Sequence, residues 1–153
     1  MLNKNAFFLL GVSPRDNQET IADAFDEKAS DGVHDEALLH QAHRTLMASK
    51  SRLAAEVSWF PDITPKLAKK ISEKIEFNFN KSQADFFIGL LSELNGLSKA
   101  NLAAYICSIK QGNIEFLNAI ISSLSEVSPA NIQACINANR KVSGFPEVNE
   151  DLG

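Results

Sequence analysis

The sequence predicts an all-α protein, an antiparallel helical hairpin followed by a helical bundle, and three observations support this class. Apolar residues recur every three to four positions along most of the chain, which is the spacing of one face of an amphipathic helix. Residues suited to N-caps precede these stretches, and Gly or Pro follows most of them. No stretch shows the alternation of apolar and polar residues expected of a half-buried strand.

Residues 1–60 are expected to hold the hairpin and two short flanking helices. A capping residue precedes each of the first three helices and a terminator follows it: Asn5 and Gly11, Asn17 and Gly32, Asp35 and the segment MASKS. A fourth helix is expected from about Arg52, and it should end before Pro61 because the residue preceding a proline avoids the α-helical region. The apolar stripes that should pack together are Ile21, Ala22, Ala24, Phe25 and Ala29 in the second helix, Leu38, Leu39, Ala42 and Leu46 in the third, and Leu53, Ala54, Val57 and Trp59 in the fourth.

Residues 64–143 are expected to form the bundle. Thr64 and Pro65 suit an N-cap and a first helical position, and this helix should end near Glu76, before the breaking segment FNFNKS. Further helices are expected over 82–94, 98–111, 113–124 and 129–142. Residues 144–153 are predicted to be a polar tail, which could open a further helical region in a longer chain.

Two segments of the bundle repeat one another in sequence. LSKANLAAYICSI aligns with VSPANIQACINAN after a shift of 30 residues. A period of this length suits a duplicated helical hairpin. The alternative is that both segments obey the same rules for starting a helix, with Ser128 as the N-cap of the second.

Composition sets limits on function. The chain has 153 residues, 44% of them hydrophobic, which is enough for a real core. Its net charge of −4 argues against nucleic acid as a partner. No stretch is long enough to span a membrane and the run from Ala6 to Leu10 is too short for a signal peptide, so we expect a cytoplasmic protein. Cys107 and Cys135 lack metal-type spacing and are expected to be buried, reduced thiols.

The first 60 residues carry the residue pattern of one known family. FFLLGVSPRDNQETIADAF and HQAHRTLMASKSRLAAEV contain the matching positions Phe8, Leu10, Gly11, Val12, Ile21, Ala24, Phe25, Ala42, Leu46 and Arg52. In these positions the chain resembles the J domains of DnaJ-like co-chaperones. Its spacing is most similar to the J domain of the iron–sulfur-cluster co-chaperones, which also have a helical bundle after it. The resemblance implies a J-like hairpin and a heat-shock ATPase chaperone as a partner.

The connection between the hairpin helices departs from the family. There the family has His-Pro-Asp, which contacts the ATPase and triggers hydrolysis, whereas this chain has Val33, His34 and Asp35. The side chain of Val33 cannot form hydrogen bonds, His34 replaces the proline, and Asp35 is accounted for as an N-cap. We therefore expect a degenerate J-like domain that lacks the trigger.

The charge of the second helix is also reversed relative to the family, whose second helix is basic. This chain has one base, Lys28, among five acids: Glu19, Asp23, Asp26, Glu27 and Asp31. Repulsion between like charges would weaken binding to the acidic face of the chaperone.

The sequence contains no motif that predicts catalysis. It lacks a P-loop, a Rossmann glycine pattern and a nucleophile elbow, so we expect no enzyme and no cofactor. Glu36, His40 and His43 share one helix face and have the types of side chain that bind zinc or nickel. They lack an HExxH motif or a Cys partner, so a solvated polar face is the simpler interpretation and no metal is expected.

The remaining candidates are binding surfaces. Lys66, Lys69 and Lys70 form, with Lys74, a basic stripe on one predicted helix, which is either a solvated face or a contact surface. The aromatic residues near the boundary between the halves either join the hairpin to the bundle or form an exposed patch: Trp59, Phe60, Phe77 and Phe79.

These features together predict a non-catalytic protein–protein interaction module, an adaptor or scaffold that holds another protein. The alternative is a specialised co-chaperone that regulates a heat-shock ATPase without His-Pro-Asp. The sequence does not identify the partner.

Overall fold

The computed structural model describes residues 2–76, 81–109, 118, 121–122 and 127–149, and this part of the chain is built of helices without strands. The all-α prediction is therefore confirmed there. The elements are η1 (Leu2–Lys4), α1 (Ala6–Leu10), α2 (Gln18–Ser30), α3 (Glu36–Met47), α4 (Ser49–Val57), α5 (Pro65–Glu76), α6 (Lys81–Leu91), α7 (Gly96–Ile109) and α9 (Pro129–Ser143). Within the same ranges, every helix is too short or too polar to cross a bilayer.

Five helices begin where the sequence predicts, because a side-chain oxygen satisfies a free N–H group in the first turn of each. Asn5 accepts from Phe7 N, Asn17 from Thr20 N, Asp35 from Ala37 N and Leu38 N, Thr64 from Leu67 N, and Ser128 from Asn131 N. Gly11 ends α1 in the left-handed region at φ 69°, where a side chain would be strained. Capping by local sequence thus sets the boundaries of these helices.

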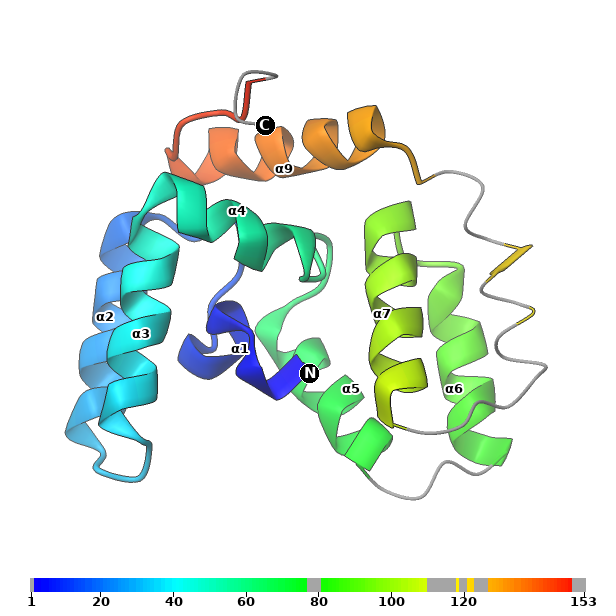
Figure 1. Ribbon diagram of the computed structural model, residues 1–153. Helices are drawn as coiled ribbons and strands as arrows, with labels where there is room; N and C mark the ends of the chain where they lie inside the picture. Colours follow the sequence, from blue (N-terminus) through cyan, green and yellow to red (C-terminus); the bar gives the residue numbers. More distant parts are fainter. Residues whose placement is uncertain (1, 77–80, 110–117, 119–120, 123–126, 150–153) are drawn as a thin grey trace.

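The helices of the first half wrap around α1. α2 and α3 pack side by side and run in opposite directions, and α1 lies against both of them (Figure 1). Ala48 has an extended backbone, φ −97° and ψ 121°, which separates α3 from α4 within the weak segment MASKS. α9, from the far end of the sequence, lies along α4, and α5 contacts α1 (Figure 1).

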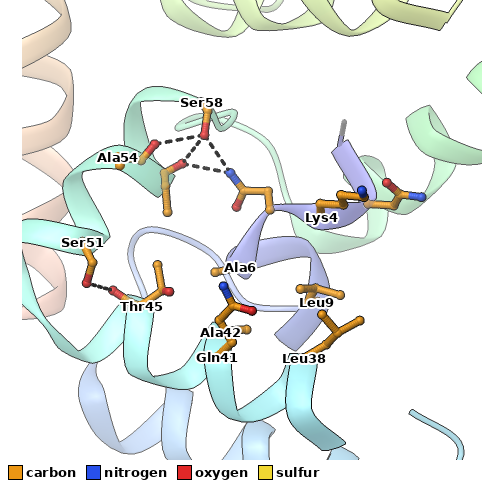
Figure 2. Close-up of a pocket in the computed structure, with 13 residues that line it drawn as sticks. Lys4, Ala6, Leu9, Leu38, Gln41, Ala42, Thr45, Ser51, Ala54 and Ser58 are labelled. Atoms are coloured by element: carbon orange, nitrogen blue, oxygen red, sulfur yellow. Dashed lines mark hydrogen bonds between the residues drawn. The ribbon is translucent and has the colours of Figure 1, made fainter. Parts of the chain in front are cut away.

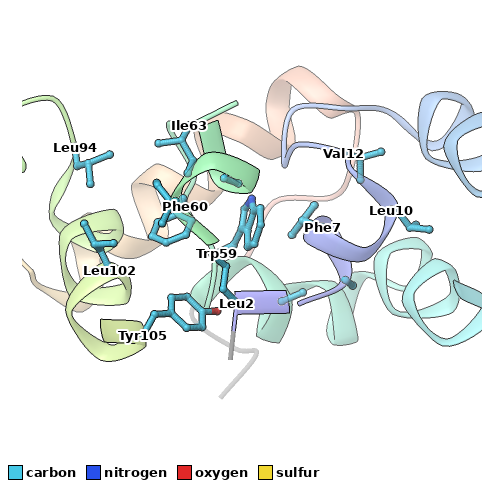
Figure 3. Packing of buried hydrophobic residues seen from close by; sticks show 14 of the residues in the cluster. Leu2, Phe7, Leu10, Val12, Trp59, Phe60, Ile63, Leu94, Leu102 and Tyr105 are labelled. Carbon is cyan, nitrogen blue, oxygen red and sulfur yellow. The ribbon is translucent and has the colours of Figure 1, made fainter. Parts of the chain in front are cut away.

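One cluster of buried side chains crosses the expected boundary at residues 60–64. Trp59 and Phe60 lie in its middle, only 1% and 0% exposed. Trp59 stacks on Phe7 with ring centroids 6.0 Å apart, and Phe60 lies 5.8 Å from the ring of Tyr105 in α7 (Figure 3). Trp59 and Phe60 therefore join the two halves, as one interpretation of the aromatic residues predicts; Phe77 and Phe79 lie outside the described residues.

The predicted buried face of α4 is wrong. Its buried residues are Arg52, Ala55 and Glu56, whereas Ala54 and Val57 are exposed. The reason is that Arg52 and Glu56, one turn apart, pair with each other at 2.8 Å and are covered by α9. Some residues of the apolar stripes predicted for the second and third helices are exposed as well, among them Ala29 of α2 and Leu38 of α3.

α7 begins two residues earlier than predicted. Asn95 accepts a hydrogen bond from Ser98 N at 2.9 Å, so the helix starts at Gly96 and Ser98 lies inside its first turn. The aligned residue Ser128 is an N-cap instead, so matched residues of the two similar segments occupy different helical positions. The helix expected over 113–124 lies almost wholly outside the described residues.

The expectation of two buried thiols is wrong for one cysteine. Cys107 is exposed on α7, and Cys135 is half-buried on α9. Both are free thiols, and the Sγ atom of Cys135 accepts a hydrogen bond from Asn95 at 3.2 Å.

The segment after α9 folds back onto the protein, although its composition predicts a polar tail. Phe145 is 4% exposed, and its ring lies 3.8 Å from the guanidinium of Arg52. Val148 N donates to Asn137 of α9 at 2.7 Å. Residues 144–149 are thus packed against α4 and α9.

Candidate functional site

A cavity of about 460 Å³ lies between α1, the loop after α2 and the first turns of α5. We call it the basic cavity. Four of its lining residues were singled out from the sequence in separate segments: His34, Trp59, Lys66 and Lys69. The other lining residues are Phe7, Phe8, Gly11, Lys28, Pro65 and Ala68. The structure therefore brings together the loop that contains His34, the aromatic junction and part of the basic stripe.

Aromatic rings form one wall of the basic cavity. Trp59 stacks on Phe7, and its ring meets Phe8 edge to face at 6.4 Å. Phe7 and Trp59 are almost fully buried, so packing in the core fixes the position of this wall. Phe8 is the partly exposed ring of this wall, so it offers the apolar surface that a ligand can contact.

The indole nitrogen of Trp59 is a buried donor, and it has no hydrogen-bond partner among the described residues. In Figure 3 this nitrogen is at the end of the ring nearest the ribbon of α5, whose residues Pro65 and Ala68 also line the basic cavity. A buried N–H group without an acceptor destabilises a protein by about 1–3 kcal/mol. Because this nitrogen is fully buried, a group bound in the cavity does not reach it unless the surrounding side chains move.

The lining of the basic cavity is positively charged, although the chain carries a net charge of −4. It includes Lys28, Lys66 and Lys69, and no Asp or Glu is among the described residues that line it. Lys28 lies over α1, since a Cβ on Gly11 would be 3.6 Å from its Cε atom. The N-terminus of α5, at Pro65, adds the positive end of a helix dipole.

Of the three loop residues Val33, His34 and Asp35, only His34 lines the basic cavity. The Nδ1 atom of His34 lies 3.2 Å from Asp31. The backbone N–H of Val33 donates to Asp31 at 2.9 Å, and this bond, followed by the contact with His34, lowers the pKa of the Asp31 carboxyl. Val33 is 82% exposed outside the lining, and the Asp35 carboxylate caps α3 as predicted.

Two predicted site residues lie outside the basic cavity. Phe60 is fully buried between Trp59 and Tyr105. The ammonium group of Lys70 lies 5.3 Å from the centre of the Phe86 ring, beside that of Lys74 at 4.8 Å. The basic stripe therefore extends from the cavity along α5 to an aromatic ring of α6.

Six of the lining residues were not predicted to belong to a site, among them Phe7, Phe8 and Lys28. Phe7 and Phe8 look like ordinary core positions of the first helix, and their part in a cavity depends on α5, far along the chain. Lys28 carries a weak signal, since it is the only base in α2. Its position as an isolated base in an acidic helix could have marked it.

The possible metal ligands on α3 are engaged in other contacts. The rings of His40 and His43 lie 4.9 Å and 4.8 Å from the ring of Phe25 in α2. His40 Nε2 is 3.7 Å from the Glu36 carboxylate. Within the described ranges, no three His, Cys, Asp or Glu side chains are grouped as metal ligands.

A second cavity, of about 430 Å³, lies between α1, α3 and α4 (Figure 2). Several of its polar groups bind one another: Asn5 donates to Ala55 O at 3.0 Å and to Ser58 Oγ at 3.1 Å, and Ser51 donates to Thr45 O at 2.9 Å. Lys4 is the one lysine among its described lining residues, whereas three lysines line the basic cavity. The basic cavity is therefore the stronger candidate site.

The arrangement in the basic cavity suits binding of an anion that also carries an apolar group. Its cations can hold negative charge, and the partly exposed ring of Phe8 can cover an apolar neighbour. Comparison with models of known protein families, with curated proteins and with solved structures gives no match to this chain.

Proposed function

We propose that this protein is a non-catalytic interaction module, an adaptor that binds an acidic segment of a partner protein in the basic cavity. The observation that carries this proposal is that the described lining residues include three lysines and a histidine but no carboxylate, beside a fixed aromatic wall. Opposite charges attract partners and select among them. The partner is proposed to be a cytoplasmic protein, and its binding is proposed to require no cofactor.

An extended partner segment fits better than a compact ligand. Lys70 and Lys74 continue the positive charge along α5 beyond the basic cavity, over the ring of Phe86. A ligand confined to the cavity would not reach them, whereas a peptide with several acidic residues would contact both places.

A peptide-binding assay tests the proposal. The probe is a fluorescent octapeptide of alternating Glu and Phe, and its binding to the whole chain is followed by anisotropy. We expect binding that weakens with salt, because charge attraction is screened. The same peptide with Gln in place of Glu should bind at least tenfold more weakly.

Two variants of equal charge locate the binding site. Lys66→Glu with Lys69→Glu should weaken binding of the Glu/Phe peptide at least tenfold. Lys50→Glu with Lys141→Glu changes the net charge equally at two exposed positions outside the basic cavity, and it should have a much smaller effect. Equal losses in both variants, or tighter binding of a single-stranded oligonucleotide than of the peptide, would contradict the proposal.

Regulation of a heat-shock ATPase is the alternative function, and it has less support. The carboxylates of α2 are exposed at Glu19, Asp23, Asp26 and Glu27, and Asp35 is engaged in capping. We expect no stimulation of ATP hydrolysis in a single-turnover assay with a heat-shock ATPase. Asp35→Asn keeps a good capping side chain but removes the charge, so stimulation that is lost in this variant would favour the alternative.

A further inference from the structure

We propose that a second copy of this chain binds in the basic cavity through residues 31–36, the connection between α2 and α3 together with the first residue of α3. We call this segment the hairpin loop. In a two-fold pair, the hairpin loop of each copy enters the basic cavity of the other. The inference rests on the proposed function, because it names an occupant for the same cavity, which a partner segment then displaces.

The hairpin loop has the composition that the basic cavity is proposed to bind. Val33 is 82% exposed, more than any other large hydrophobic side chain that the structure describes. Asp31, Asp35 and Glu36 are exposed on either side of it. The loop therefore presents one apolar side chain among three carboxylates.

The shape of the hairpin loop is set within the loop itself. The backbone N–H of Val33 donates to the Asp31 carboxylate at 2.9 Å, and Asp35 caps α3. Between them, Gly32 adopts the left-handed region at φ 65°. A segment held in one conformation loses less entropy on binding than a flexible peptide does, so the loop is a preformed ligand.

The basic cavity complements the hairpin loop in charge and in size. Lys28, Lys66 and Lys69 line it, and the described lining residues include no Asp or Glu, so lysines face the carboxylates of the loop. The partly exposed ring of Phe8 offers an apolar surface to Val33. A volume of about 460 Å³ lies within the usual range for cavities that bind small ligands, about 300–1,000 Å³. It therefore has room for the tip of a loop.

The hairpin loop and the basic cavity adjoin each other on the molecule. His34 lines the cavity, whereas its neighbour Val33 lies outside the lining. A two-fold interface uses the same patch on both copies, so the patch must complement itself. This patch meets the requirement, because it carries both an acidic loop with an apolar tip and a cavity suited to bind it. Two equivalent contacts therefore form together.

Sedimentation velocity of the whole chain tests the inference. Protein concentrations from about 10 µM to about 1 mM cover the dissociation constants of weak dimers. We expect a monomer–dimer equilibrium that shifts towards the monomer as salt is added, because salt screens the attraction between the loop and the cavity. The Glu/Phe octapeptide should also shift it towards the monomer, since both ligands occupy the same cavity.

One pair of variants tests the apolar tip of the hairpin loop. Val33→Ser removes an apolar side chain from both contacts of the pair, and it should weaken dimerisation at least tenfold. Val142→Ser makes the same change at an exposed position of α9 outside the basic cavity, and it should leave the equilibrium unchanged. Both valines are exposed, so neither change disturbs the core.

A second pair of variants tests the cavity. Lys66→Glu with Lys69→Glu should weaken dimerisation at least tenfold. Lys50→Glu with Lys141→Glu gives the chain the same net charge, and it should have a much smaller effect because both positions lie outside the basic cavity.

The outcomes separate this inference from the proposed function. A chain that stays monomeric at every concentration but binds the octapeptide would overturn the inference and leave the adaptor proposal standing. Dimerisation that Val33→Ser and the Lys66/Lys69 variant leave intact would place the contact on another face and overturn it as well. If both variants weaken the dimer but the octapeptide neither binds nor displaces the loop, the inference stands and the adaptor proposal is wrong.

Discussion

Arg140 of α9 donates a hydrogen bond from Nε to the Glu56 carboxylate of α4 at 2.9 Å, although 84 residues separate them in the sequence. The other carboxylate oxygen accepts from Arg52 at 2.8 Å. All three side chains are almost fully buried. Burial lowers the pKa of Arg52, and its bond to Glu56 opposes this change. One carboxylate therefore neutralises two buried cations only in part, and carbonyl oxygens accept their remaining N–H groups, among them Pro14 O and Ser49 O.

Removal of the Glu56 charge should strongly destabilise the protein. Glu56→Gln leaves two buried guanidinium groups without their anion, and breaking a buried ion pair from one side typically lowers stability by about 3–5 kcal/mol. Urea unfolding followed by circular dichroism measures the loss. Glu147→Gln, at an exposed position, should change the free energy of unfolding by less than about 0.5 kcal/mol. A loss at Glu56 as small as that of the control would contradict the expectation.

Tyr105 should make stability fall at high pH. Burial raises the pKa of its phenol from 10.0 to about 12, and the phenol donates to Ser58 O at 2.7 Å. The folded chain thus keeps a proton that the unfolded chain releases. The stabilisation is complete below pH 10 and is lost as the pH rises through about 12, with a decrease of about 1.4 kcal/mol by about pH 11.

The only tyrosine of the chain makes this titration easy to follow. Phenolate absorbance should have its midpoint near pH 12 in the folded protein and near 10 in urea. Tyr105→Phe should remove this part of the pH dependence of unfolding, leaving the contribution of the lysines. Coinciding midpoints in the folded and unfolded chains would show that burial does not protect the phenol.

Two glycines should respond in opposite ways to alanine. Gly89 lies within α6, and a Cβ there would meet no atom within 4 Å. Gly89→Ala should raise the free energy of unfolding by about 0.5–1 kcal/mol, because Ala favours helix more than Gly does. Gly11→Ala should lower it by about 1–2 kcal/mol, since φ at this position is +69°. Thermal unfolding of both variants checks the two signs together.

The two thiols should differ in reactivity. Cys107 is exposed, whereas burial and then the charge of Asp62 raise the pKa of Cys135, against the opposing effect of its bond from Asn95. Because the thiolate is the reactive form, iodoacetamide at about pH 8 should label Cys107 well before Cys135. Peptide mass mapping over time measures both rates. In urea the two rates should become similar; if Cys135 reacts as fast as Cys107 in the folded chain, the assignment of its environment is wrong.

Local rules predict much of this fold because they act within a few residues. Asn5, Asn17, Asp35 and Ser128 begin their helices as expected, since a cap depends only on its own side chain and the next turn. The same rules predict the wrong start for α7, because Ser98 looks like an N-cap whereas Asn95 accepts the capping hydrogen bond. There Ser98 hydrogen-bonds to Asp62, a residue far back in the chain.

The face of α4 and the basic cavity could not be predicted in the same way. A charged residue is taken as exposed unless a partner is known, and the partner of Glu56 is on α9. Likewise, the sequence identifies Lys66 and Lys69 as a stripe and Trp59 as a junction residue, but their meeting with Lys28 depends on how α5 docks against α1. The candidate residues were therefore available from the sequence, whereas their grouping was not.

The clasp of Arg140 on Glu56 has a consequence for synthesis on the ribosome. At about 5–20 residues per second, roughly 4 to 17 seconds pass between translation of Glu56 and translation of Arg140. During that interval the Arg52–Glu56 pair of the nascent α4 is not covered by α9. The buried ion-pair cluster can therefore form only after α9 has been synthesised.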